Sequence, residues 1–155
     1  MSRQDRYWDS STFIAFFREE EGRVELCRAI IDAAINGDVR IVTSTLTFSE
    51  VVHIRHRERL TAEMEDELKA FFEYSFIVPV VLDRTVSEYA RELMWRHSHL
   101  RPYDANHLSS AYHAGVNIID SFDDDFLRLN GQFTGMDGSP IHIGHPSGWN
   151  LSLDL

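Results

Sequence analysis

The chain has 155 residues, 43% of them hydrophobic and 12% aromatic, which is enough to bury the core of one globular domain and argues against disorder. Fifteen Lys and Arg against 25 Asp and Glu give a net charge of −10, which argues against binding nucleic acid through bulk positive potential. Without a membrane-length apolar run or an apolar signal sequence, and with Cys27 as its single cysteine, the chain is predicted to be cytoplasmic.

Short apolar runs alternate with longer segments of helical periodicity, a pattern typical of parallel strands joined by crossover helices. Strands are predicted at residues 6–9, 39–44, 76–82 and 116–120. Helices are predicted at residues 12–22, 23–37, 47–60, 61–75, 85–98 and 102–115. The sequence therefore predicts an α/β fold with a central, mostly parallel sheet.

The composition changes after about residue 133, where Gly, Ser and Pro become frequent. We expect one domain over residues 1–133 and a C-terminal tail, residues 134–155, packed on the same domain. A short edge strand is expected around residues 141–143.

Three carboxylates follow predicted strands. Asp9 ends the first strand, Glu50 follows the second, and Asp123 follows the last. Ligands of an open α/β sheet bind beyond the carboxyl ends of its strands, so these side chains should meet at one edge. On the predicted helix, Glu50 lies on one face between Leu46 and Ile54.

A fourth carboxylate, Asp104, is predicted on a helix. Leu108, Ala111 and Gly115 follow it at plus four, seven and eleven, so Asp104 should share the inward face. A buried charge needs a cation or a hydrogen-bond donor beside it.

Capping is the alternative explanation for each acid. Asp9 is suited to cap the helix that follows it, and Asp104 to complement the positive end of its own helix. Thr47 and Glu50 have capping-box spacing. Asp125 is either a solvated or capping residue or an accessory carboxylate. Capping alone does not predict all four acids at strand exits or on an inward face.

The segments "YWDSSTFIAFF", "TSTLTFSEVV", "YDANHLSSAYHAG" and "IIDSFDDDF" together resemble the four acidic motifs of PIN-domain ribonucleases. Within that family they are most similar to VapC-type toxins of bacterial and archaeal toxin-antitoxin pairs. The resemblance covers roughly residues 5–130, which would make residues 1–133 a PIN-like nuclease domain. It implies Asp9, Glu50, Asp104 and Asp123 as the catalytic, metal-binding quartet.

The resemblance also implies Ser11 and Ser121 as supporting hydroxyls and Asp125 as a possible further metal ligand. It implies a three-layer α/β/α fold, divalent-metal-dependent cleavage of RNA, a homodimer and a cognate antitoxin. Asp120 departs from the family pattern, where an apolar residue is more usual. Asp120 is expected either to alter metal affinity or to face solvent.

All-oxygen ligands select hard cations, so Mg²⁺ or Mn²⁺ is the expected cofactor. Such ions polarise the scissile phosphate and lower the pKa of an attacking water. Because the net charge is negative, RNA phosphates beside the site need locally placed cations. Four arginines are candidates, namely Arg55, Arg57, Arg96 and Arg101; solvated helix faces and intrahelical ion pairs are their alternative roles.

Two other functions remain open. One is a PIN-like module that binds RNA or protein without cleaving it. The other is a metal-dependent phosphatase, which is weakened because "DSSTF" lacks the second Asp, two residues on, of phosphoaspartate-forming enzymes. His53 and His56, three residues apart, are a weaker candidate pair for a transition metal.

Overall fold

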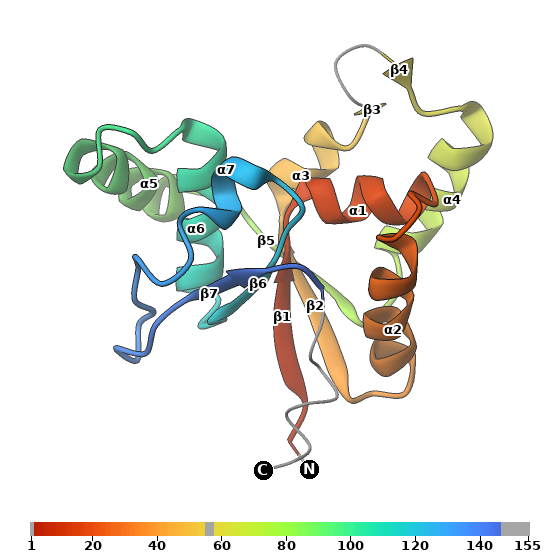
Figure 1. The fold of residues 1–155 in the computed structure, drawn as a ribbon, viewed down its shortest axis with the longest axis horizontal. Helices are drawn as coiled ribbons and strands as arrows, with labels where there is room; N and C mark the ends of the chain where they lie inside the picture. Colours follow the sequence, from red (N-terminus) through yellow and green to blue (C-terminus); the bar gives the residue numbers. More distant parts are fainter. Residues whose placement is uncertain (1, 55–57, 147–155) are drawn as a thin grey trace.

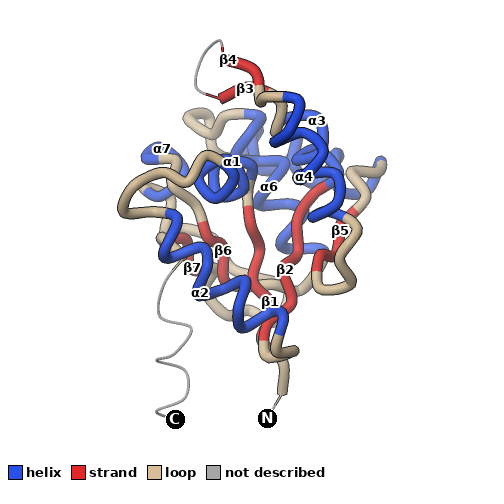
Figure 2. The backbone as a smooth tube through the Cα atoms, turned by 90° about the vertical axis from the view of Figure 1, so that its right-hand side faces the viewer, coloured by secondary structure: helices blue, strands red, loops and turns tan. Residues whose placement is uncertain are grey.

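A five-stranded sheet with all strands parallel forms the centre of the protein (Figure 1; Figure 2). The computed structural model describes residues 2–54 and 58–146. The strands, in order across the sheet, are β5 (Ile77–Val80), β2 (Val39–Ser44), β1 (Gln4–Trp8), β6 (Ile118–Asp120) and β7 (His142–Gly144). This confirms the predicted α/β fold with a mostly parallel sheet.

Helices cover both faces of the sheet (Figure 1). One face carries α1 (Ser10–Phe17), α2 (Val24–Ile35) and α4 (Ala62–Phe72), and the other carries α5 (Arg84–Arg96), α6 (Pro102–His113) and α7 (Asp124–Leu127). Successive strand residues supply the two cores in turn: Tyr7 and Val42 belong to one, Trp8 and Ile41 to the other. The predicted three-layer α/β/α arrangement is therefore confirmed.

The predicted helix over residues 47–60 is wrong. Helix α3 (Thr45–Glu50) ends early, and β3 (His53–Ile54) then pairs antiparallel with β4 (Glu58–Arg59). Val51 leaves helical geometry, with φ −84° and ψ 68°, and buries its side chain in the core beside α1 and α2. β-branched residues such as Val51 and Val52 lose side-chain freedom in a helix, which favours ending α3 at this point. Burial of the Val51 side chain in the core favours the same break. Glu50 is thus the last residue of α3, not the middle of a long helical face.

The N-terminus of α3 also differs from the capping-box alternative. Ser44, not Thr47, is the N-cap, and its Oγ accepts a hydrogen bond of 3.1 Å from the amide of Leu46. The Thr47 hydroxyl instead lies 2.7 Å from the Thr43 hydroxyl, where both side chains are buried.

Helix α6 has its predicted inward face with one exception. Asp104, Leu108 and Ala111 are buried, whereas Gly115 is exposed and lies beyond the end of the helix. Gly115 has φ +71°, a conformation that glycine adopts readily, and it follows the C-cap Ala114. Gly115 therefore helps to end the helix and does not share the face of Asp104.

The chain reverses its direction across the sheet between β1 and β6. It runs from β1 to β2 and β5 on one side, then returns to β6 and β7 on the other. Ligands bind at such a switch point, beyond the carboxyl ends of the two strands. Asp9 follows β1 and Ser121 follows β6, so both stand at this position.

Strand β7 lies at the edge of the sheet beside β6, and Ile141 and Ile143 are buried in the core around α5 and α6. Residues 147–155 of the predicted tail lie outside the described part of the chain. Within residues 2–54 and 58–146, no helix is long and apolar enough to cross a membrane.

Candidate active site

Asp9 is fully buried at the end of β1, where both of its oxygens accept hydrogen bonds. Oδ1 accepts from the Ser11 hydroxyl at 2.7 Å and from the Thr12 amide and hydroxyl at 3.2 and 3.1 Å. Oδ2 accepts from the Ser121 hydroxyl at 2.6 Å and from the Tyr103 hydroxyl at 3.0 Å. Asp9 is therefore the N-cap of α1, and it is also held from β6 and α6.

The two serines predicted to support the site join the segments after β1 and β6. Ser121 Oγ accepts from the amide of Asp123 at 3.0 Å, and Ser11 Oγ accepts from the amide of Phe122 at the same distance. Both hydroxyls donate to Asp9, and each makes one bond across the two segments: Ser11 by accepting from Phe122 and Ser121 by donating to Asp9. This fixes the loop after β6 against the start of α1.

Glu50 is held through Oε1 by two side chains from different elements. The Ser10 hydroxyl donates at 2.6 Å, and His107 Nε2 lies 2.9 Å away. His107 is fully buried, and its Nδ1 lies 2.6 Å from the Tyr7 hydroxyl. Burial raises the pKa of Tyr7 well above its ordinary value, so Tyr7 keeps its proton and can donate to Nδ1. The tautomer that suits both contacts has its proton on Nε2, which then donates to Glu50.

Asp104 and Asp123 share one cation, the guanidinium of Arg101. Arg101 Nε and Nη2 each lie 3.0 Å from an oxygen of Asp104, and Nη2 is also 3.1 Å from Asp123 Oδ1. Nη1 lies 3.1 Å from Asp125 Oδ2. Asp123 Oδ1 also caps α7 by accepting from the amides of Asp125 and Phe126.

Electrostatics at Asp104 favour a cation beside it. Burial raises the pKa of Asp104, the nearby charges of Asp123 and Asp125 add to this, and the hydrogen bonds from Arg101 oppose it. The pKa of Arg101 is raised, chiefly by its hydrogen bond to Asp104, so the guanidinium stays charged. The buried carboxylate is therefore compensated by a cation that is itself half-exposed.

Shared partners link three of the four predicted acids into one network. Ser121 bonds to Asp9 and to the amide of Asp123, and Arg101 connects Asp123 to Asp104. Glu50 bonds to different side chains, Ser10 and His107, which stand next to Asp9 in sequence and on the same helix as Asp104. Capping explains part of the arrangement of Asp9 and Asp123, whereas side chains hold Glu50 and Asp104.

Carboxylate oxygens are the ligands that hard metal cations prefer, so the chemistry of this donor set fits such an ion. The guanidinium of Arg101, itself a cation, already contacts the carboxylates of Asp104, Asp123 and Asp125. Across the described residues, however, no three His, Cys, Asp or Glu side chains stand together as a group able to hold a metal ion. The oxygens are instead bonded to Arg101, to hydroxyls, to His107 and to the capping amides. Of the four acids, Asp104 and Asp123 are those whose oxygens contact Arg101.

Asp120 does not face solvent, so that part of the expectation is wrong, whereas its effect on metal affinity stays a prediction. It is buried at the end of β6, where Arg6 Nε and Nη2 donate to its two oxygens at 2.8 and 2.6 Å. Trp8 Nε1 donates at 2.9 Å. Burial raises the pKa of Asp120, while Arg6 and Trp8 oppose the shift. Asp120, the residue that departs from the family pattern, therefore forms a buried ion pair with Arg6 that joins β6 to β1.

Of the four candidate RNA-binding arginines, Arg101 lies at the predicted site, where it contacts Asp104 and Asp123. Arg96 forms an ion pair of 2.5 Å with Glu92 on the same helix, as the intrahelical alternative predicts. Arg55 and Arg57 lie outside the described residues, as does His56 of the His53 pair.

Sequence reasoning missed four side chains that touch the predicted quartet: Ser10, Thr12, Tyr103 and His107. Tyr103 and Ser10 are sequence neighbours of Asp104 and Asp9. His107 lies three residues after Asp104, which places it on the same helical face. A polar residue at that spacing on a buried face was the available signal.

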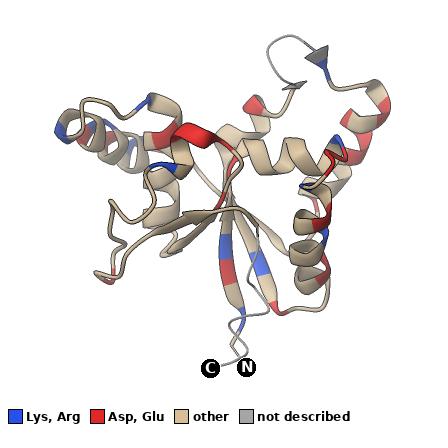
Figure 3. Cartoon of the chain, viewed as in Figure 1, with Lys and Arg blue, Asp and Glu red and all other residues tan. Residues whose placement is uncertain are grey.

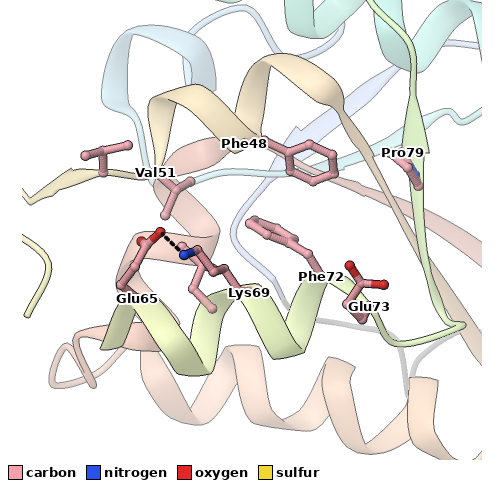
Figure 4. Close-up of a pocket in the computed structure, with 9 residues that line it drawn as sticks. Phe48, Val51, Glu65, Lys69, Phe72, Glu73 and Pro79 are labelled. Atoms are coloured by element: carbon pink, nitrogen blue, oxygen red, sulfur yellow. Dashed lines mark ion pairs between the residues drawn. The ribbon is translucent and has the colours of Figure 1, made fainter. Parts of the chain in front are cut away.

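Acidic residues are widespread on the surface: Figure 3 shows them on α7, α2 and α4, with basic residues scattered among them. A separate apolar groove of about 590 Å³ lies between α3 and α4 (Figure 4). Phe48 and Phe72 face one another there, with ring centres 4.6 Å apart, and Glu65 pairs with Lys69 at its rim. Glu50 does not line this groove, which is distinct from the acidic network.

The fold and the acidic network define an α/β domain with carboxylates at the switch point of a parallel sheet. The chain belongs to the PIN domain family, which matches residues 6–132. This confirms the resemblance seen in the four sequence motifs.

Solved structures similar to this fold include a VapC toxin and chains of VapBC complexes. VapC20 of Mycobacterium tuberculosis, a Sarcin-Ricin loop cleaving toxin, is 18% identical with a TM-score of 0.64, over 78% of this chain and 92% of that one. A chain of VapBC2 from Rickettsia felis, bound to a promoter DNA fragment, is 12% identical with a TM-score of 0.59, over 81% and 93%. A chain of DNA-bound VapBC from Salmonella typhimurium is 14% identical with a TM-score of 0.58, over 90% of this chain and 98% of that one. No curated protein matches the chain by sequence.

Proposed function

We propose that this protein is a metal-dependent endoribonuclease that hydrolyses RNA phosphodiester bonds in the cytoplasm, and that it is the toxin of a toxin-antitoxin pair. One observation carries the proposal: in a PIN domain, shared hydrogen-bond partners link Asp9, Asp123 and Asp104 at the switch point of the sheet, and Glu50 bonds to Ser10, beside Asp9, and to His107, on the helix of Asp104. The VapBC structures with this fold support an antitoxin partner. A homodimer is part of the same proposal.

In this mechanism the four acids would hold Mg²⁺ or Mn²⁺, with Asp125 as an additional oxygen donor. Bound there, the metal would supply Lewis acidity to the scissile phosphate and to an attacking water. Ser11, Ser121 and Tyr103 orient the oxygens of Asp9, and His107 orients Glu50 by donating from Nε2. Arg101 supplies positive charge beside the acids for an RNA phosphate.

A second candidate is a PIN module that binds RNA or a protein partner without cleaving it. Arg101 favours this alternative, because it bonds to Asp104, Asp123 and Asp125 at once. If this contact persists with metal in solution, the quartet remains blocked.

RNA cleavage separates the two candidates. Structured and unstructured RNAs are incubated with the wild type, Asp9→Asn and Asp104→Asn, with and without Mn²⁺, and products are followed on denaturing gels. We expect cleavage only with metal, reduced at least about 100-fold by either substitution, because each removes a charged metal ligand. Asp66→Asn, an exposed acid on α4, is the matched control and should cleave like the wild type.

Asparagine is also a good N-cap, so Asp9→Asn should keep α1 in place. RNA that is retained but never cut, with any divalent metal, would support the binding module. Cleavage that survives both substitutions would reject the quartet as the active site.

A further inference from the structure

Arg101 occupies an unusual place for a surface arginine. It precedes Pro102 at the start of α6, its side chain is 43% exposed, and its guanidinium contacts three carboxylates. Asp104, its bidentate partner, has a side chain that is only 4% exposed. The guanidinium is thus anchored at its inner end and remains accessible to solvent at its outer end.

The oxygens that Arg101 contacts are those proposed to hold the metal. Like charges held close together repel strongly in the partly buried surroundings of a protein, and a divalent ion doubles the repulsion of a single charge. An ion bound to Asp104 and Asp123 would stand beside nitrogens that lie 3.0 to 3.1 Å from the same oxygens. The guanidinium and the ion therefore exclude each other from this position.

Resting on the metal site proposed above, we propose that Arg101 is an internal competitor for the divalent ion. It neutralises Asp104 and Asp123 until Mg²⁺ or Mn²⁺ binds, and it then leaves them for the solvent side. This role explains how a buried carboxylate is accommodated in a fold without prior metal binding, since an uncompensated buried charge is strongly destabilising. It also makes the metal affinity lower than the carboxylates alone would give.

The test compares Mn²⁺ binding to Arg101→Gln with binding to Arg128→Gln, by titration calorimetry and by the signal of free Mn²⁺ in electron paramagnetic resonance. Arg128 is the matched control because its Nη1 lies 3.1 Å from Asp125, the exposed acid of the same cluster. Both variants remove one positive charge there. We expect about tenfold tighter Mn²⁺ binding in Arg101→Gln than in Arg128→Gln, together with a larger rise of the melting temperature on adding Mn²⁺.

Arg101→Lys keeps the charge but not the planar, bidentate geometry, so its affinity should lie between the wild type and Arg101→Gln. It also serves as the test variant if Arg101→Gln does not fold. An equal increase of Mn²⁺ affinity in Arg101→Gln and Arg128→Gln, or no increase in either, would overturn the competitor role while leaving the metal site intact. Absence of Mn²⁺ binding in the wild type and in every variant would overturn the metal site as well.

Discussion

Two aspartates with nearly equal burial have different surroundings. Asp120 is enclosed with Arg6, itself only 4% exposed, and with the Trp8 indole. Asp104 meets a half-exposed guanidinium that can turn toward solvent. Because the Arg6 pair is sealed in the core, we assign Asp120 to stability and Asp104 to the proposed chemistry.

The assignment of Asp120 predicts the effect of Asp120→Asn. Asp120→Asn removes the carboxylate charge that faces the buried guanidinium of Arg6, which should lower the free energy of unfolding by about 3–5 kcal/mol. Denaturant unfolding measures this loss, and replacing both partners by apolar residues, Arg6→Met with Asp120→Leu, should recover much of it. A stable Asp120→Asn protein that no longer binds Mn²⁺ would instead make Asp120 a metal ligand.

At the scale of elements, α3 shows how packing overrides a helical pattern. Residues 47–60 have helical periodicity, yet α3 ends at Glu50 because Val51 turns into the core. The early end matters for the site, since Glu50 reaches His107 and Ser10 from the last position of the helix. By contrast, Pro102 and Gly115 correctly predicted where α6 begins and ends.

Adjacent valines test this break. Val51 is 1% exposed and Val52 is 37% exposed. Val51→Ala should cost about 2 kcal/mol of unfolding free energy for the buried groups it removes, whereas Val52→Ala should change stability by less than about 1 kcal/mol. Thermal and denaturant unfolding of the two variants provide the measurement. Equal effects would mean that Val51 does not anchor the end of α3.

For the whole molecule, the C-terminal segment contributes to the same core as the sheet and its helices. Ile141 and Ile143 are each 2% exposed and pack in the cluster that contains residues of β1, β2, α5 and α6. Strand β7 also covers the outer edge of β6, whose end positions Ser121 beside Asp9. The edge strand therefore supports the network from outside it.

Substitution of Ile143 tests this contribution. Ile143→Ala should lower the free energy of unfolding by about 2–5 kcal/mol, as for other large apolar residues cut back in a core. His142→Ala, at an exposed neighbouring position of the same strand, should have little effect. A loss under about 1 kcal/mol in Ile143→Ala would show that β7 is dispensable for the fold.

The sequence by itself determined the α/β class, the parallel sheet and the placing of acids after strands, because periodicity and chain order are local properties. It also pointed to Asp104 as a buried charge through the spacing of its helix. Nothing local predicted that Asp120 would pair with Arg6 in the core, or that Val51 would end α3.

Only the tertiary structure decided which partner each carboxylate has. The bonds from Arg6 to Asp120 and from Ser121 to Asp9 join residues 114 and 112 positions apart, and Arg101 reaches Asp123 across 22. Burial makes such partners necessary, since a buried charge must be compensated. Which donor supplies the compensation follows from the packing of β1, β6 and α6, and that packing brought Arg101 to the acids.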